Sequence, residues 1–453
     1  MSKLNQNTLL IRNAWILTND ETDRVIERGY VWIEDGVIRQ AGPDNGDLSE
    51  LSSRAGRVLD GKGHILMPGL INGHTHLFQT FMRGLADDKP LLQWLREEIW
   101  PFSTAMEEED FYLTGLLGCL ENLKNGATSV VDQHYIHTTP GTSDMVLKAM
   151  TESGIRGVLC RTFSNFNYTP DLQEEDQKIL DSLERLTETY HGAEDGRLGI
   201  SVGPINPWGC TVELYRKTYE YARDKGLKYQ IHTAETQSVV DRCLEMYGMR
   251  NVEFFEDMGI LDENTQLAHG IWLNDRELEL AASRKATVVH CPVANMYLAD
   301  GIARVPEMRS LGIHVALGTD GPGSNNSQDM MEVLKTTACL HKVNTLDPMI
   351  LQPEDVIRMA TLEGSQVLGR EDLGRVAPGY RADLILVDWR KAHIAPVHKP
   401  ASAVVYNANG NDVNTTIVDG RIVMEDRKVT FVDEQALIET CQERIRAIRK
   451  RIS

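Results

Sequence analysis

Eight strand-like apolar runs alternate with helix-length amphipathic segments through the middle of the chain. The runs lie at 65–73, 127–132, 155–162, 198–204, 226–232, 265–269, 286–291 and 312–319. Strands that alternate with amphipathic helices are typical of βα units, which build a parallel sheet. Eight such units predict an α/β fold with a (β/α)8 TIM barrel, in which chemistry takes place at the carboxyl ends of the strands.

Short alternating strands with turn signals stand at both ends of the chain. Asp35-Gly36 marks a hairpin turn near the start, and segments such as RADLILVDW and ASAVVYNA follow Gly374. Each end is too short to form a robust sheet alone, and chain termini often lie close together. We therefore expect a small β-sandwich made from residues 1–66 and 374–453, the latter with a C-terminal helix, beside a barrel of residues 67–373.

Charge and composition exclude several classes of partner. The formal net charge of −19 argues against nucleic acid and anionic membranes, because both require a basic surface. No apolar run reaches the roughly 18 to 20 residues of a membrane span. The seven cysteines show no CxxC spacing, which argues against a disulfide framework or a structural zinc knuckle. We expect a cytoplasmic protein with reduced cysteines and a small-molecule ligand.

Polar side chains follow four of the predicted strands. His74 and His76 stand one residue apart at the end of the first strand, so their side chains would share one face. The other candidates follow strands five, six and eight, and they are His232 with Glu235, His269, and Asp320. Taken singly, each is more often a hydrogen-bonded core histidine, a turn residue or a surface acid. Together at one rim, they predict a divalent metal site suited to Zn²⁺, with Fe²⁺ or Mn²⁺ as competitors.

Longer motifs surround these residues: MPGLINGHTH, HTAET, AHG, HCPVANMYLADGIA, LGTDGPGSNNS and GRVAPGYRADLILVD. Together they resemble the amidohydrolase superfamily, and more narrowly its branch of cytosine-deaminase-like and s-triazine hydrolases, which includes the methylthioadenosine/S-adenosylhomocysteine deaminases. The likeness covers nearly the whole chain. It implies a homodimer or larger homo-oligomer and one metal ion, held by His74, His76, His232 and Asp320. Strand four ends in GISVGPINP, without the lysine that bridges two metals in other branches.

This resemblance and elementary chemistry together imply a hydrolytic mechanism. A bound divalent ion lowers the pKa of water from about 15.7 towards 7. Asp320 would accept the proton of that water, and Glu235 would carry a proton to a ring nitrogen if burial holds its pKa near neutral. His269 would stabilise the developing tetrahedral centre. Collapse of this centre would expel ammonia or another leaving group.

Loop residues around the predicted rim indicate the substrate. Amide and indole groups suit a flat, nitrogen-rich heterocycle, although ordinary loop packing is an equal alternative for each residue. These residues are Gln79, Trp94, Trp208 and Asn295. Ile205 and Leu92 stand where the methylthioadenosine-type enzymes have a histidine and, in some, a glutamate. We expect an amino-substituted N-heterocycle such as a triazine, purine or pterin, with a purine nucleoside of the methylthioadenosine/S-adenosylhomocysteine type as the alternative.

Three functional classes are compatible with a chain of this kind. A hydrolytic deaminase requires metal ligands and a proton carrier such as Glu235, and all these residue types are present. A ring-opening amidohydrolase of cyclic amides would be expected to carry a strand-four lysine or a different strand-five motif. A non-catalytic binding protein on the same fold would be expected to lack one or more of the six polar residues. The site residues, rather than the fold, therefore favour the deaminase.

Overall fold

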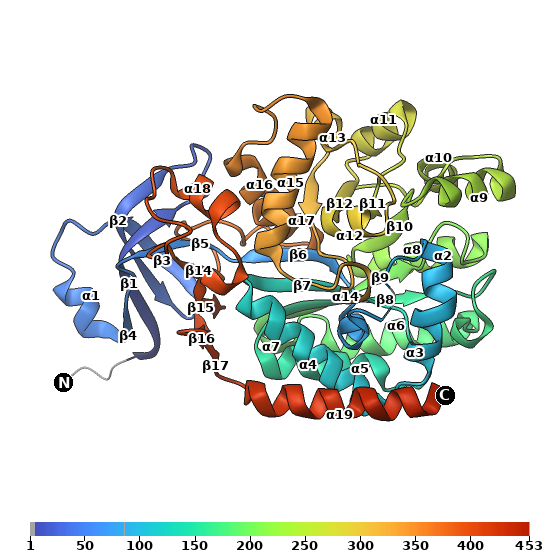
Figure 1. The fold of residues 1–453 in the computed structure, drawn as a ribbon, viewed down its shortest axis with the longest axis horizontal. Coiled ribbons are helices and arrows are strands. Elements are labelled where there is room, and N and C mark those ends of the chain that lie inside the picture. The colour runs from blue at the N-terminus through green and yellow to red at the C-terminus, as the bar shows by residue number, and fades with distance from the viewer. Residues whose placement is uncertain (1–4, 86, 453) are drawn as a thin grey trace.

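Eight parallel strands form the barrel of the computed structural model, which describes residues 5–85 and 87–452 (Figure 1). Each strand pairs with the next one along the chain, from first to last. The strands are β6 (Leu70–Thr75), β7 (Ala127–His134), β8 (Arg156–Phe163), β9 (Leu198–Pro204), β10 (Tyr229–Thr233), β11 (Thr265–His269), β12 (Thr287–His290) and β13 (Val315–Leu317). The predicted barrel is confirmed.

Helices follow each barrel strand and surround the sheet (Figure 1). After the first four strands come η1 (Leu77–Met82), α2 (Leu91–Trp94), the π-helix η2 (Leu95–Ile99), α3 (Trp100–Thr104), α4 (Glu108–Lys124), α5 (Thr142–Ser153), η3 (Pro170–Leu172), α6 (Asp176–Tyr190), α7 (Ala193–Gly196) and α8 (Val212–Lys225). After the last four come α9 (Gln237–Tyr247), α10 (Asn251–Met258), α11 (Asp275–Ser283), α12 (Pro292–Tyr297), α13 (Val305–Ser310), α14 (Pro322–Asn325), α15 (Met330–Thr345), α16 (Pro353–Ala360) and α17 (Leu362–Val367).

The segment PEDVIRMATLEGSQVLG opens with proline and acids and closes at glycine, which predicts one helix over residues 353–369, and as a single helix this prediction is wrong. Thr361 leaves the helical conformation, with φ −131° and ψ −80°, so α16 ends before it and α17 begins after it. The hydroxyl of Thr361 accepts a hydrogen bond from Nδ2 of Asn19 at 2.9 Å. This contact with a residue near the start of the chain stabilises the break in the helix. Helix propensity alone cannot predict the break, because the contact joins residues that are far apart in sequence.

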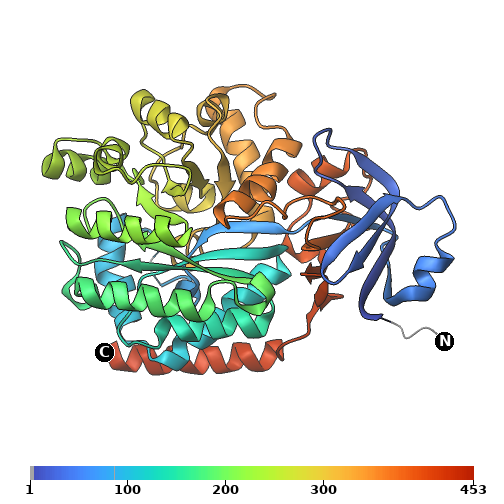
Figure 2. The ribbon, with the colours of Figure 1, turned by 180° about the vertical axis from the view of Figure 1, so that it is seen from behind.

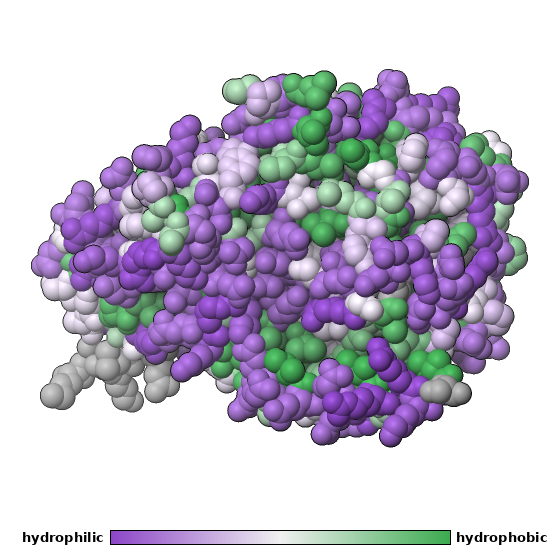
Figure 3. All heavy atoms as spheres, viewed as in Figure 1, coloured by the Kyte–Doolittle hydropathy of each residue, from purple (hydrophilic) through white to green (hydrophobic). Residues whose placement is uncertain are grey.

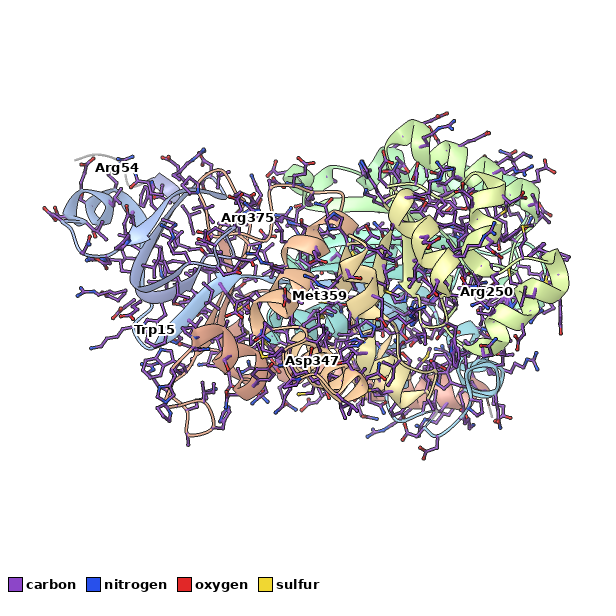
Figure 4. All side chains as sticks on the ribbon, turned by 90° about the horizontal axis from the view of Figure 1, so that it is seen from above. Trp15, Arg54, Arg250, Asp347, Met359 and Arg375 are labelled. Carbon is purple, nitrogen blue, oxygen red and sulfur yellow. The ribbon has the colours of Figure 1, made fainter. Side chains whose placement is uncertain are left out.

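Both ends of the chain contribute to a second sheet of nine strands, beside the barrel (Figures 1 and 2). Its strands are β1 (Asn5–Leu17), β2 (Val25–Glu34), β3 (Val37–Pro43), β4 (Ala55–Asp60), β5 (His64–Pro68), β14 (Leu384–Asp388), β15 (Val413–Val418), β16 (Arg421–Glu425) and β17 (Lys428–Val429). The short helical segments α1 (Ser49–Arg54), α18 (Pro400–Ser402), η4 (Ala403–Asn407) and η5 (Gly410–Asp412) flank these strands. Figure 4 shows Trp15 and Arg54 in this part of the molecule and Arg250 at the opposite end, in the barrel.

The hairpin turn predicted at Asp35-Gly36 joins β2 to β3. Both residues have positive φ, +51° and +75°, as a two-residue hairpin of this type requires. The strand predicted at 65–73 instead divides at Gly69, so that β5 joins the small sheet and β6 begins the barrel. A Cβ atom at Gly69 would lie 2.2 Å from the side chain of Thr128, so only glycine fits this change of sheet. The boundary proposed between residues 66 and 67 therefore lies within β5.

Hydrogen bonds close the barrel between its last and first strands. The backbone N–H of Asp320 donates to the carbonyl of His74 at 2.9 Å. Beside it, the N–H of Thr319 donates to Oδ1 of Asn72 at 3.0 Å, and Nδ2 of Asn72 donates to the hydroxyl of Thr319 at 2.8 Å. These contacts hold the chain after β13 against β6.

The C-terminal helix α19 (Glu434–Ile452) lies along the barrel rather than on the small sheet (Figures 1 and 2). Arg444 anchors it, because Nε of Arg444 donates to Oδ1 of Asp110 in α4 at 2.6 Å. Hydrophilic residues cover most of the face that Figure 3 shows, as the net charge of −19 leads us to expect. Among the helices in the described part of the chain, none combines the length and apolar character that a membrane crossing demands.

A buried ion-pair group joins the barrel to the small sheet. Arg156, at the start of β8, donates from Nε to Oδ2 of Asp383 at 2.7 Å and from Nη2 to Oδ1 of Asp383 at 3.0 Å. Nη2 also donates to Oδ1 of Asp419 at 3.2 Å. The two aspartates flank β14 and β15, and all three side chains are at least 92% buried, since their exposed fractions are 3%, 4% and 8%. Asp419 also pairs with Arg381, so removing the Arg156 guanidinium would leave chiefly the buried Asp383 carboxylate without its ion pair.

We therefore expect Arg156→Met to lower the free energy of unfolding by about 3–5 kcal/mol. The exposed pair of Arg185 and Asp144, with Arg185 46% exposed, provides the control, and Arg185→Gln should change stability by less than about 1 kcal/mol. Urea unfolding of both variants measures the difference. Equal, small effects would show that the buried group contributes little.

Candidate active site

Four histidines and one aspartate lie together at the carboxyl ends of barrel strands. His74 lies in β6 and His76 directly after it, His232 lies in β10, His269 ends β11, and Asp320 follows β13. The centroid of the His74 ring lies 4.9 Å from that of His76, 5.0 Å from that of His232 and 5.5 Å from that of His269. The structure thus brings together residues that are up to 246 positions apart, from His74 to Asp320.

Backbone carbonyls fix the orientation of two of these rings. Nδ1 of His76 lies 2.6 Å from the carbonyl oxygen of Gln133, and Nδ1 of His232 lies 2.6 Å from that of Ile205. A carbonyl only accepts hydrogen bonds, so each Nδ1 must carry a proton and donate it. A neutral imidazole then has its lone pair on Nε2.

Side-chain amides orient the other two rings. Oε1 of Gln230 lies 2.8 Å from Nδ1 of His74, and Nε2 of Gln230 donates to the carbonyl of Gly73 at 3.0 Å, which fixes the orientation of this amide. Oδ1 of Asn295 lies 3.0 Å from Nδ1 of His269. Partners of this kind hold metal-binding imidazoles in one tautomer and raise their basicity.

The Nε2 atoms of three histidines and the Asp320 carboxylate lie close together. Nε2 of His76 lies 3.4 Å from Nε2 of His232 and 3.2 Å from Oδ1 of Asp320, and Nε2 of His74 lies 3.5 Å from the same oxygen. Nε2 of His74 is buried and has no hydrogen-bond partner among the described residues. Lone pairs at these distances repel unless a proton or a metal cation lies between them.

The donor atoms fit a divalent metal ion. The ligand atoms of His74, His76 and His232 all lie within 4.8 Å of one another, and so do those of His74, His269 and Asp320. Imidazole nitrogen and carboxylate oxygen are ligands of zinc and of iron(II). The geometry is compatible with His74, His76, His232 and Asp320 as the residues that would hold the metal, which is the set that the family resemblance implies, and His269 lies within reach of the same site.

Burial sets the charges of the cluster. It lowers the pKa of His74 to about 4 and that of His232 well below the usual value, so both rings are neutral at pH 7. Burial opposes ionisation of Asp320, but His74 and His76 outweigh it and hold the pKa of this carboxyl well below its usual range. Neutral imidazoles and an ionised carboxylate are the protonation states that metal binding requires.

Three residues of the site have a left-handed backbone. The φ angles are +47° at Ala234, +70° at His269 and +62° at Asp320. For residues other than glycine, such conformations cost about 1–3 kcal/mol each and cluster at functional sites. At Asp320 the backbone bond to His74 and a 2.7 Å hydrogen bond from the hydroxyl of Ser324 to Oδ2 hold the residue in place.

A second carboxyl lies beside the cluster, and it is protonated whereas that of Asp320 is ionised. Glu235 follows β10 and is 7% exposed, and its Oε1 lies 3.8 Å from Nε2 of His269. Burial, and then the negative charge of Asp320, raise the pKa of Glu235 to about 8. Glu235 is therefore protonated at neutral pH and can donate a proton.

A cavity opens beside these groups, and Glu235, His232 and Asp320 form part of its wall. Gln79, Trp94 and Trp208, which the sequence suggests as substrate contacts, also line it. Nε2 of Gln79 donates to the hydroxyl of Tyr135 at 3.3 Å, and Nε1 of Trp94 donates to the carbonyl of Gly323 at 3.0 Å.

Asn295 has a different position from the other three. It is not among the described residues that line the cavity, and its side chain contacts the ring of His269 instead. Gln230 and Tyr135 also belong to the site, although the sequence did not indicate them. The ring of Tyr135 packs edge-on against that of His76, with the centroids 5.3 Å apart. Gln230 stands two residues before His232, so strand periodicity could have placed both side chains on one face. No comparable signal points to Tyr135.

Comparisons with known proteins match the whole architecture. The sequence profile of the amidohydrolase family matches residues 65–423. The chain is 38% identical over 447 residues to a 5′-deoxyadenosine deaminase of Methanosarcina barkeri, covering 98% of this chain and 99% of the relative. It is 36% identical over 436 residues to a 5-methylthioadenosine/S-adenosylhomocysteine deaminase of Pelotomaculum thermopropionicum, covering 96% and 98%.

Solved structures share the same fold. An adenosine deaminase from Xanthomonas campestris with bound zinc superposes with a TM-score of 0.90 at 27% identity, over 98% of both chains. A variant of triazine hydrolase superposes with a TM-score of 0.90 at 25% identity, over 97% of this chain and 99% of that one. The family match, which spans most of the chain, and the deaminases that align with nearly its full length show that this protein belongs to the amidohydrolase family.

Proposed function

We propose that this chain is a metal-dependent hydrolytic deaminase, which removes an amino or similar leaving group from an N-heterocycle. The observation that carries the proposal is a pair of buried carboxyls in one cavity wall, with Asp320 ionised and Glu235 protonated. Such a pair supplies both the base and the acid that hydrolysis of a cyclic amidine requires. The relatives and solved structures named as deaminases support this activity.

The charge of each residue determines its role in the reaction. The metal, when bound, supplies a water molecule of lowered pKa and a Lewis acid. Asp320 would accept a proton from the attacking water, and Glu235 would donate a proton to the ring nitrogen where negative charge develops. Because Oδ1 of Asn295 accepts a hydrogen bond from Nδ1 of His269, Nε2 of this ring faces the cluster. We propose that it orients the attacking water, in place of the stabilisation of the tetrahedral centre that the sequence led us to expect. The proton held by Asp320 would then pass to the amino group, which leaves as ammonia, while the proton of the new hydroxyl would return to Glu235 as the carbonyl forms.

Zinc is the metal that we propose, with iron(II) as the alternative. Three imidazoles and one carboxylate suit zinc, and the adenosine deaminase from Xanthomonas campestris holds zinc. We also propose a cytoplasmic location, which seven free cysteines support, since oxidising compartments favour disulfides. The family resemblance supports a homodimer or larger homo-oligomer.

Within this activity, we propose an adenine nucleoside with an apolar 5′ substituent as the first substrate class and an amino-triazine as the second. Ile205 and Leu92 line the cavity and offer no hydrogen bond to a ribose hydroxyl, which by itself disfavours a nucleoside, so the support for this class comes from the relatives. The relatives at 38% and 36% identity are named as deaminases of adenosine derivatives, whereas the triazine hydrolase variant shares 25%.

An ammonia-release screen of 5′-deoxyadenosine, 5-methylthioadenosine, amino-triazines, pterins and pyrimidines tests the proposal. We expect ammonia from at least one adenine nucleoside at a kcat/KM at least about tenfold above that for any triazine, which corresponds to about 1.4 kcal/mol of transition-state binding. Mass spectrometry of the products detects leaving groups other than ammonia. A zinc-loaded protein that hydrolyses none of these heterocycles would refute the deaminase.

Two variants separate metal binding from proton transfer. Glu235→Gln should keep the metal and lose about 10²–10⁴-fold in turnover, because an amide cannot supply the proton. His232→Ala should lose most of the metal as well as activity, because it removes one nitrogen ligand. Metal analysis and ammonia release on both variants provide the measurements. Wild-type turnover in Glu235→Gln would exclude this residue as the proton carrier.

The pH dependence of kcat/KM should follow the fraction of Glu235 that is protonated. Its pKa is raised to about 8, so the proton-donating form predominates below that pH and is lost above it. We expect kcat/KM to fall with a limiting slope of −1 above about pH 8. The residual activity of Glu235→Gln should lack this basic limb. The same limb in the variant would assign the titration to another group.

A further inference from the structure

Two buried glutamines lie side by side on neighbouring strands of the barrel. Gln230 is the second residue of β10 and Gln266 the second of β11, and the two pair in register. Their exposed fractions are 0% and 1%. Nε2 of Gln230 donates a hydrogen bond to Oε1 of Gln266 at 3.0 Å. Because an amide donates only through nitrogen and accepts only through oxygen, the orientation of each side chain depends on that of the other.

Backbone carbonyls exclude the reversed orientation of both amides. Nε2 of Gln266 donates to the carbonyl of Val367 at 2.8 Å, so Oε1 of Gln266 faces Gln230. Nε2 of Gln230 donates its second hydrogen to the carbonyl of Gly73 at 3.0 Å. A carbonyl accepts and never donates, so reversing either amide would place oxygen against oxygen. Oε1 of Gln230 therefore faces His74, and it lies 2.8 Å from Nδ1 of that ring.

The Asp320 carboxylate favours the other tautomer of His74. Oδ1 of Asp320 lies 3.5 Å from Nε2 of His74, and a carboxylate attracts a hydrogen-bond donor. With Asp320 as its only polar neighbour, the neutral ring of the metal-free protein would carry its hydrogen on Nε2. That hydrogen would occupy the position where a metal must bind. The oxygen of Gln230 opposes this tautomer, because it requires the hydrogen on Nδ1.

We propose that Gln266 is a positioning residue for the metal site, which acts through Gln230 to keep the lone pair of His74 on Nε2 before the metal binds. The chain of hydrogen bonds starts at the carbonyl of Val367, the last residue of α17, where the end of a helix leaves carbonyls without partners inside the helix. Gln266 is not among the described residues that line the cavity. The inference rests on the metal site of the proposed function, and it adds a residue that contacts neither the ligand atoms nor the substrate.

Two substitutions at Gln266 distinguish positioning from packing. A carboxylic acid buried at this place stays protonated, so Gln266→Glu keeps one donor for Val367 and one acceptor for Gln230. Gln266→Met has a similar shape and provides neither group. We expect Gln266→Met to raise the Kd for zinc about tenfold and Gln266→Glu to stay within about threefold of wild type, as measured by competition with a chelator. A side chain that only fills space would be replaced better by methionine, so equal Kd values or the reverse order would overturn the inference.

A double-mutant cycle tests the route through Gln230. Gln230→Met should raise the Kd for zinc by about 10- to 100-fold, because it removes the acceptor of the Nδ1 hydrogen of His74. Once Gln230 is replaced, adding Gln266→Met should change this Kd by less than about twofold, because Gln266 then has no partner through which to act. Additive effects of the two substitutions would show that Gln266 acts independently of Gln230, and they would overturn the inference.

Nitrogen NMR of the imidazole rings in metal-free protein keeps this test separate from the proposed activity. The chemical shift of each ring nitrogen reports whether it carries a hydrogen, and the signals of His74 are those that disappear in His74→Ala. We expect the hydrogen on Nδ1 of His74 in wild-type protein and partly on Nε2 in Gln266→Met. This result supports the positioning role even if the zinc-loaded protein releases no ammonia, an outcome that refutes only the deaminase. A wild-type ring with its hydrogen on Nε2 would overturn the inference, whatever the activity.

Discussion

The hydrogen bonds at Nδ1 of four histidines are the interaction on which the site depends. A buried neutral imidazole can present its lone pair on either nitrogen, and only the partner of the other nitrogen decides which. At His76 and His232 that partner is a backbone carbonyl of the barrel, so the orientation is built into the sheet. The lone pairs converge because the scaffold already occupies the opposite edge of each ring, and the metal need not reorganise them.

The two buried carboxyls of the site have opposite roles because their neighbours differ. Asp320 stays ionised because His74 and His76 contact it, whereas Glu235 has only a distant imidazole and a like charge nearby. A solvated site would let both ionise at neutral pH. The same desolvation that neutralises His74 and His232 therefore creates the acid that the reaction requires, and metal binding and proton transfer share one physical cause.

The sequence predicts the barrel and the meeting of His74, His232 and Asp320, because strand periodicity and the polarity of a parallel sheet determine both. The sequence cannot predict which atoms orient the histidine rings, because the carbonyls of Gln133 and Ile205 belong to the backbone and do not depend on the residue type. The expected substrate contacts rested on residue type in loops whose course the sequence does not determine. Asn295 illustrates the limit, because an amide that could bind a heterocycle orients His269 instead.

The small sheet affects the site through its covalent connection to β6 rather than through direct contact with the site residues. Only Gly69 separates β5, paired in that sheet, from β6, which carries His74. Arg156 joins the same sheet to β8 through buried ion pairs. The hydrogen bond from the backbone N–H of Asp320 to the carbonyl of His74 holds β6 on the side that faces β13. A shift of β5 would therefore carry the first histidines away from Asp320. An error of about 1 Å in the position of a catalytic group can cost about 10²-fold in rate. The appended sheet therefore supports catalysis by holding β6 in position.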